Sequence, residues 1–142
     1  MEALEALEAL VAAHPATNFI GVHVGGYAEN LGWVGRMLAT YPNFSVDTAA
    51  RIAELGRQPR AARDLLLSHP GRVLFGADAL PPDPELYAIY FRFLETADEH
   101  FPYAPESIPP QGRWAISGLD LPDDVLGRIN SANARRLLPA TI

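Results

Sequence analysis

The sequence predicts an α/β fold in which parallel strands alternate with helices. Three short apolar segments, bounded by glycine, proline or asparagine, have the composition of strands. Helical patterns separate them, and the centres of the segments lie about 24 and 29 residues apart. Strand–helix–strand units of this length form parallel sheets with right-handed crossovers. The spacing fits a small open sheet, and it also fits consecutive units of a (β/α)8 barrel from which about five strands are missing.

The composition indicates one acidic globular domain over residues 1–142, large enough for a single hydrophobic core. The chain has 11 Lys and Arg residues against 17 Asp and Glu, so its net charge of -6 disfavours nucleic acid and anionic membranes as partners. Cysteine is absent, so any metal must bind to His, Asp or Glu. The chain begins with an acidic, periodic segment and has no long apolar run, and we therefore expect a cytoplasmic protein.

The first two elements differ clearly in pattern. Leucines recur every three residues, with glutamates between them, until His14 and Pro15 end the pattern. This periodicity predicts an amphipathic helix. The next segment, Phe19–Val24, is apolar apart from His23 and is closed by two glycines. We expect a strand here that is buried on both faces of the sheet.

The rest of the chain continues the alternation. Proline in the first turn and Asp83 as a cap support two of the later helices. Four prolines and the lack of any period predict a surface loop over His100–Leu119. The expected elements are helices at about Ala28–Thr40, Ile52–Gly56, Pro59–Ser68, Pro84–Glu99 and Leu121–Leu138, and strands at Asn43–Asp47 and Arg72–Gly76.

Each predicted strand ends on or near a titratable residue: His23, Asp47 and Asp78. Because the carboxyl ends of parallel strands meet at one rim, we expect these three residues on the same rim. A histidine and carboxylates there suit acid–base chemistry or a metal site. Structural roles stay open for each: a hydrogen-bonded core histidine, a cap of the following helical turn for Asp47, and a turn cap for Asp78.

Few residues other than these three are candidates for binding a ligand. Arg51 lies one helical turn beyond Asp47, where its guanidinium would reach an anionic substrate. The two glycines after His23 lack a phosphate loop or dinucleotide fingerprint around them, so no nucleotide cofactor is indicated. An aromatic stripe at helical spacing, Tyr87, Tyr90 and Phe91, predicts core or partner contacts.

Three motifs carry a family resemblance: Phe19–Gly26, Tyr41–Arg51 and Arg72–Asp78. In this order and spacing they resemble the last third of the amidohydrolase-related (amidohydrolase 2) enzymes, which are metal-dependent (β/α)8-barrel hydrolases and decarboxylases. Asn133–Leu138 is similar to the closing helix of that family. The resemblance implies that the chain holds strands six to eight of a barrel that is incomplete as given.

The resemblance also implies roles for site residues. His23 resembles the sixth-strand histidine that orients or deprotonates a metal-bound water, and that lies close enough to count as a possible ligand. Asp78 resembles the eighth-strand aspartate that binds the metal and shuttles protons, although this chain has Gly-Ala-Asp where the family usually has Gly-Thr-Asp. Asp47 and Arg51 match the seventh-strand segment, and the family gives them no firm catalytic role. The implied cofactor is a divalent metal, zinc or alternatively manganese.

The ligand set is incomplete in this chain. The family has a His-x-His pair in its first strand and a further histidine in its fifth, whereas the four histidines here, His14, His23, His69 and His100, include no such pair. We therefore expect a truncated metal-dependent hydrolase or non-oxidative decarboxylase acting on a small organic substrate. The alternative is a non-catalytic α/β remnant or assembly module. In either case we expect self-association, or pairing with the missing half of the barrel, through exposed strand edges.

Overall fold

The computed structural model describes residues 2–138, which form a mixed α/β structure around a three-stranded parallel sheet. The strands β1 (Phe19–Gly21), β2 (Phe44–Asp47) and β3 (Val73–Leu74) lie side by side in this order. Both pairs are parallel, and the register places Gly21 beside Val46 and Val46 beside Val73. The predicted class, parallel strands alternating with helices, is confirmed.

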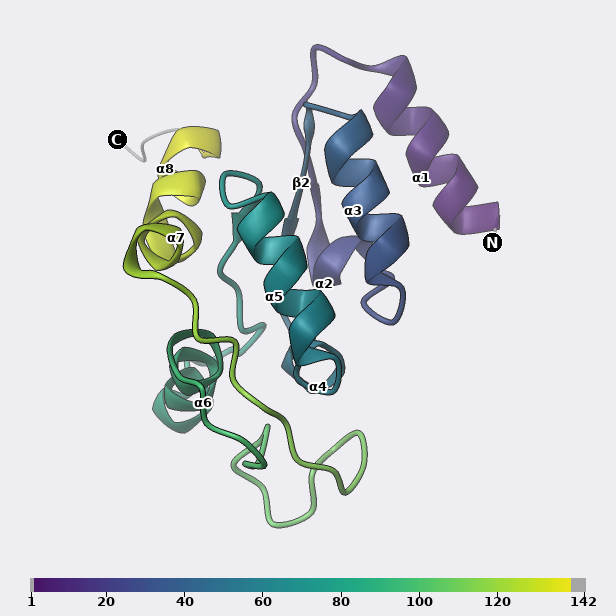
Figure 1. Cartoon of the computed structure of the whole chain (residues 1–142). Helices are drawn as coiled ribbons and strands as arrows, with labels where there is room; N and C mark the ends of the chain where they lie inside the picture. The colour runs from purple at the N-terminus through teal and green to yellow at the C-terminus, as the bar shows by residue number, and fades with distance from the viewer. Residues whose placement is uncertain (1, 139–142) are drawn as a thin grey trace.

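Helices α3 (Leu31–Thr40) and α5 (Pro59–Ser68) lie together on one face of the sheet, and α1 (Glu2–Ala13) lies beside α3 (Figure 1). The core forms between these helices and the strands and includes Val34, Met37, Phe44, Val46 and Leu66. Arg72 joins the layers, since its guanidinium donates to the carbonyl of Phe44 at 2.7 Å and to that of Tyr41 at 2.6 Å. These contacts fix the sheet against the helices at the amino ends of the strands.

The first helix forms as predicted, but its apolar face differs from the leucine triplet. Leu10 is 48% exposed, whereas Val11 is fully buried. An α-helix turns once in 3.6 residues, so a three-residue repeat drifts off the buried face by its third member. The helix is held on α3 by Glu8, which forms a bidentate pair with Arg36 at 2.6 and 2.7 Å.

The prediction for the first strand is wrong in its length and its burial. β1 ends at Gly21, and the chain turns at once into the short segment α2 (Val22–Gly25). Ile20 is 37% exposed and Val22 is 55% exposed, so β1 is not buried on both faces. The short apolar run in this segment resembles a strand buried on both faces, but no further strand covers β1 within residues 2–138.

The C-terminal half contains three further corrections. The helix α6 (Pro84–Glu95) ends four residues before the predicted boundary. The backbone amides of Leu119 and Leu121 donate hydrogen bonds to the carbonyls of Phe93 and Leu94, which would otherwise accept from the next turn of the helix. The loop over 100–119 is not purely superficial: it forms an antiparallel bridge between Phe101 and Ile116, both of which are buried. The single final helix is divided into α7 (Asp123–Gly127), a π-helical turn (Arg128–Ala132) and α8 (Asn133–Leu137).

These final helices cover the outer edge of β3. The Asn133 side chain is buried and its amide donates to the carbonyls of Pro70 and Val73 at 2.8 and 2.7 Å. The backbone amide of Phe75 donates to the carbonyl of Ile129 at 3.0 Å. The β3 edge therefore has hydrogen-bond partners without a fourth strand.

The remaining short helix, α4 (Ile52–Gly56), follows β2 and leads into α5. None of the helices within residues 2–138 has the combination of length and apolar character that crossing a bilayer requires.

Candidate functional site

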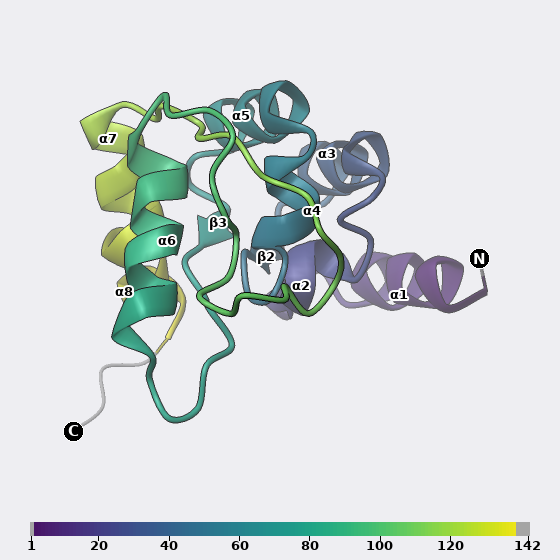
Figure 2. The ribbon, with the colours of Figure 1, turned by 90° about the horizontal axis from the view of Figure 1, so that it is seen from below.

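The carboxyl ends of the three strands open toward α4 and the long loop between α6 and α7. Figure 2 views the molecule from that end and shows the loop running across α4 and in front of β2 and β3. Asp47 is the last residue of β2, and His23 and Asp78 lie in the segments that leave β1 and β3 there. The prediction that strand ends would gather titratable residues at one end of the sheet agrees with this arrangement.

His23 lies in a left-handed turn directly after β1, not within a strand. His23 has φ 57° and ψ 45°, Val24 has φ 58° and ψ 42°, and Gly25 and Gly26 also have positive φ. Left-handed conformations cost about 1–2 kcal/mol for each residue with a Cβ, and β-branched valine adopts them rarely. Burial of Val24 in the core and a hydrogen bond to the His23 amide offset this strain.

The partner of the His23 amide is the carboxylate of Asp47, the last residue of β2. Oδ1 of Asp47 accepts from the backbone N–H of His23 at 2.8 Å and from that of Ala49 at 3.1 Å. The second contact closes a local turn after β2 and does not cap a helix, since α4 begins at Ile52 without a side-chain cap, whereas the first contact joins two strands. Hydrogen bonds to a charged acceptor contribute about 1.5–3 kcal/mol each, which is comparable with the strain of the turn.

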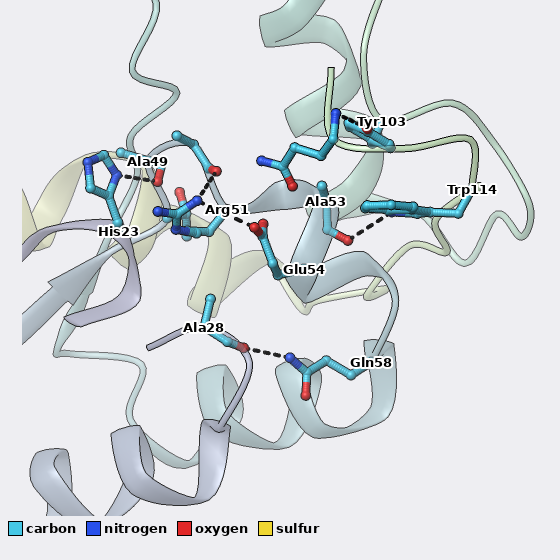
Figure 3. Close-up of polar contacts among 12 residues, drawn as sticks. His23, Ala28, Ala49, Arg51, Ala53, Glu54, Gln58, Tyr103 and Trp114 are labelled. Carbon is cyan, nitrogen blue, oxygen red and sulfur yellow. Dashed lines mark hydrogen bonds and ion pairs between the residues drawn. The ribbon is translucent and has the colours of Figure 1, made fainter. Parts of the chain in front are cut away.

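The imidazole of His23 has a defined orientation. Its Nδ1 lies 2.8 Å from the carbonyl oxygen of Ala49. A carbonyl only accepts, so Nδ1 must carry the proton and Nε2 holds the lone pair when the ring is neutral. Figure 3 shows the second ring nitrogen turned away from Ala49. This tautomer leaves Nε2 able to take a proton or to bind a metal ion.

Asp78 follows β3 at the far side of the same end of the sheet. It is exposed and has φ 58°, so the chain turns sharply at this residue. Just before it, the hydroxyl of Thr48 donates to the carbonyl of Gly76 at 2.9 Å and accepts from the Gly76 amide at 3.1 Å. Thr48 thus joins the segments leaving β2 and β3 and fixes where Asp78 begins its turn.

Asp78 borders a cavity of about 210 Å³ between these turns, α6 and the long loop. Tyr90 and Tyr103 line it with apolar residues, and Asp83 and Glu106 add further carboxylates. Tyr90 is buried and its hydroxyl lies 3.4 Å from the carbonyl of Thr48, and this burial raises the pKa of the phenol far above its usual range. Tyr103 is held by the Gln111 amide at 2.9 Å. The cavity has room for a small organic molecule.

Arg51, the residue before α4, pairs with an acid in that helix. Its Nη1 lies 3.4 Å from Oε1 of Glu54 and 3.3 Å from the carbonyl of Ala50 (Figure 3). The other oxygen of Glu54 is buried without a hydrogen-bond partner among the described residues. Arg51 thereby neutralises Glu54, and an anionic ligand would compete with this pair.

The structure brings His23 and Asp47 into contact and leaves Asp78 apart from them. No hydrogen bond or ion pair within residues 2–138 connects Asp78 with His23, and the cavity beside Asp78 is not lined by His23. Nor do three or more His, Asp or Glu side chains come together there as a possible metal site. His23 and Asp78 are the donor types that zinc accepts, but a catalytic zinc site uses three protein ligands. The described residues therefore do not fit a complete metal centre.

Sequence reasoning missed several residues that shape this end of the molecule. The sequence singles out no role for Thr48, predicts core or partner contacts for Tyr90, and places Tyr103 in a surface loop. Thr48 and Tyr90 carry hydrogen bonds that join distant segments, and Tyr103 bonds to the carbonyl of Gly112 across its own loop. No spacing signal marks such contacts, because their partners lie at sequence separations that only the fold defines.

In comparisons with known proteins, a family model described as amidohydrolase matches residues 1–140. No curated protein and no solved structure matches the chain.

Proposed function

This chain belongs to the amidohydrolase family, and we propose that it contributes His23 and Asp78 to a metal-dependent site for hydrolysis or non-oxidative decarboxylation of a small organic substrate. The observation that carries the proposal is the defined tautomer of His23. A histidine whose Nδ1 is fixed by a carbonyl presents Nε2 as a base or ligand. The family supplies the expectation of a divalent metal, zinc or manganese.

The three strands correspond in this proposal to strands six to eight of a (β/α)8 barrel. Their parallel order and the polar residues at their carboxyl ends support the assignment. Residues 2–138 gather no set of three metal-ligating side chains, so this proposal requires further ligands from outside them.

The roles of the chain's own residues follow from their surroundings. A divalent metal, if a complete ligand set held one, would supply acidified water for this class of chemistry. The Nε2 atom of His23 would accept a proton from a substrate group near the rim, and the Ala49 carbonyl would hold the ring through Nδ1. Asp78 adds an exposed carboxylate beside a cavity of about 210 Å³, which holds the organic part of the substrate. Arg51 binds an anionic substituent if Glu54 releases it.

The test is to join this chain to the first five strands of an active member of the family and to measure turnover and bound metal. We expect His23→Ala to lower turnover about a hundredfold while metal is retained, and Asp78→Ala to lower both. His14→Ala is the matched control, because His14 is exposed beyond the end of α1 and should not alter either quantity. An active hybrid in which His23→Ala keeps full turnover would contradict the proposed role.

A second function, as an assembly module, is favoured by the free edge of β1. Within the described residues β1 pairs only with β2, and Ile20 and Val22 beside that edge are exposed apolar side chains. The β3 edge is already covered by Asn133 and Ile129. We therefore propose that a further strand, from the other part of a barrel or from a second copy, pairs along β1.

Sedimentation measurements test this assembly. We expect association that rises with protein concentration and that Val22→Glu weakens, because a charge there opposes burial of the edge. Leu80→Glu is the matched control, since Leu80 is an exposed leucine in the loop after β3 and lies outside the sheet. A compact monomer over a wide concentration range would contradict the proposal.

A further inference from the structure

Asp47 is linked to His23 directly, through the backbone amide of His23, and indirectly, through Ala49. One carboxylate oxygen accepts from the His23 amide at 2.8 Å and from the Ala49 amide at 3.1 Å. The carbonyl of the same Ala49 lies 2.8 Å from Nδ1 of the His23 ring. Asp47 therefore fixes both the backbone of His23 and the residue that orients its side chain.

The sheet register explains why a side chain is needed at this point. The last pair between β1 and β2 joins Gly21 with Val46, and Asp47 is the next residue of β2. β1 leaves the ladder after Gly21 and turns into the left-handed segment, whose His23 amide is not part of the β1–β2 ladder. The carboxylate of Asp47 provides the acceptor there, and a charged acceptor forms shorter and stronger hydrogen bonds than a neutral one.

We propose that Asp47 is a positioning residue for His23, which holds the imidazole in the Nδ1–H tautomer with Nε2 directed away from Ala49. The importance of this orientation for catalysis rests on the proposed function, but the positioning itself is a property of the chain alone. A local turn after β2 would need only the contact between Asp47 and the Ala49 amide. That turn does not require the contact between Asp47 and the His23 amide, which is 24 residues away in sequence.

The experiment uses nuclear magnetic resonance on the complete chain without metal or substrate, at a pH where the imidazole is neutral. Nitrogen chemical shifts report the tautomer of His23, and amide hydrogen exchange reports the hydrogen bond of its backbone. We expect the Nδ1–H tautomer and a protected amide in the unaltered chain. Asp47→Ala should accelerate exchange of the His23 amide about tenfold or more and give a mixture of tautomers.

Two variants complete the design. Asp47→Asn keeps an acceptor oxygen at the same position, so it should largely restore the tautomer and the protection. Asp83→Ala is the matched control, because Asp83 accepts from the Glu85 amide at 2.9 Å in the same kind of local contact, away from His23. It should leave the signals of His23 unchanged.

The outcomes separate positioning from catalysis. A folded Asp47→Ala chain that keeps the original tautomer and amide protection would overturn the inference. If Asp47→Ala does not fold, Asp47→Ser takes its place, since its shorter hydroxyl caps Ala49 without reaching His23, and the same loss is expected. Failure of the hybrid enzyme would remove the proposed function and leave these spectroscopic results intact.

Discussion

Replacing Asn133 by alanine should destabilise the chain strongly, because this amide connects the final helices to the sheet. Its Nδ2 donates to the carbonyls of Pro70 and Val73 at 2.8 and 2.7 Å in a buried position. Alanine leaves both carbonyls without this donor, and each unpaired buried acceptor costs about 1–3 kcal/mol. We expect a loss of about 2–5 kcal/mol in the free energy of unfolding, a large part of the roughly 5–15 kcal/mol that stabilises an ordinary domain.

Urea unfolding followed by circular dichroism measures this loss as a shift of the midpoint at constant slope. Asn130→Ala is the matched control: its Oδ1 is buried without a hydrogen-bond partner among the described residues, so its removal should cost less than about 1 kcal/mol. The reasoning is refuted if the two variants unfold within about 0.5 kcal/mol of each other.

Three further predictions concern packing, pH and metal. Gly56→Ala should cost about 1–3 kcal/mol on urea unfolding, since its Cβ would lie 2.4 Å from Cβ of Ile116, whereas Gly127→Ala has open space and should not destabilise. The pKa of Tyr90 is raised by burial, so the unfolded chain loses this proton first; stability should fall as pH rises above about 10, and less steeply in Tyr90→Phe when unfolding is measured across pH 9–11. Calorimetry of the purified chain with zinc or manganese should show no submicromolar binding, and tight one-to-one binding abolished by Asp78→Ala would contradict the incomplete ligand set.

Local patterns in the sequence were sufficient to locate most elements. The boundaries of α4 and α5 agree with the prediction, because proline at the start of α5 and short apolar periods act within one or two turns. The alternation of strands and helices likewise predicted a parallel sheet, which the pairing of all three strands confirms.

The errors occurred where a distant segment supplies the hydrogen bonds. β1 ends early because Asp47, from the next strand, supports a left-handed turn at His23. α6 ends early because backbone amides of the segment before α7 donate hydrogen bonds to the carbonyls of Phe93 and Leu94. In both cases the sequence pattern continued past the boundary, and a contact between segments far apart in the chain ended the element.

The same distinction applies to the candidate site. The sequence by itself determined which residues lie at the ends of the strands. An apolar run and the residues that end it are local properties of the chain. Only the tertiary structure decided that Asp47 binds His23, that Arg51 pairs with Glu54, and that Asp78 lies beside a separate cavity. The physical reason is that hydrogen bonds and ion pairs depend on distances of a few ångströms between side chains, and such distances arise only once the strands are in register and the loops have folded over their ends.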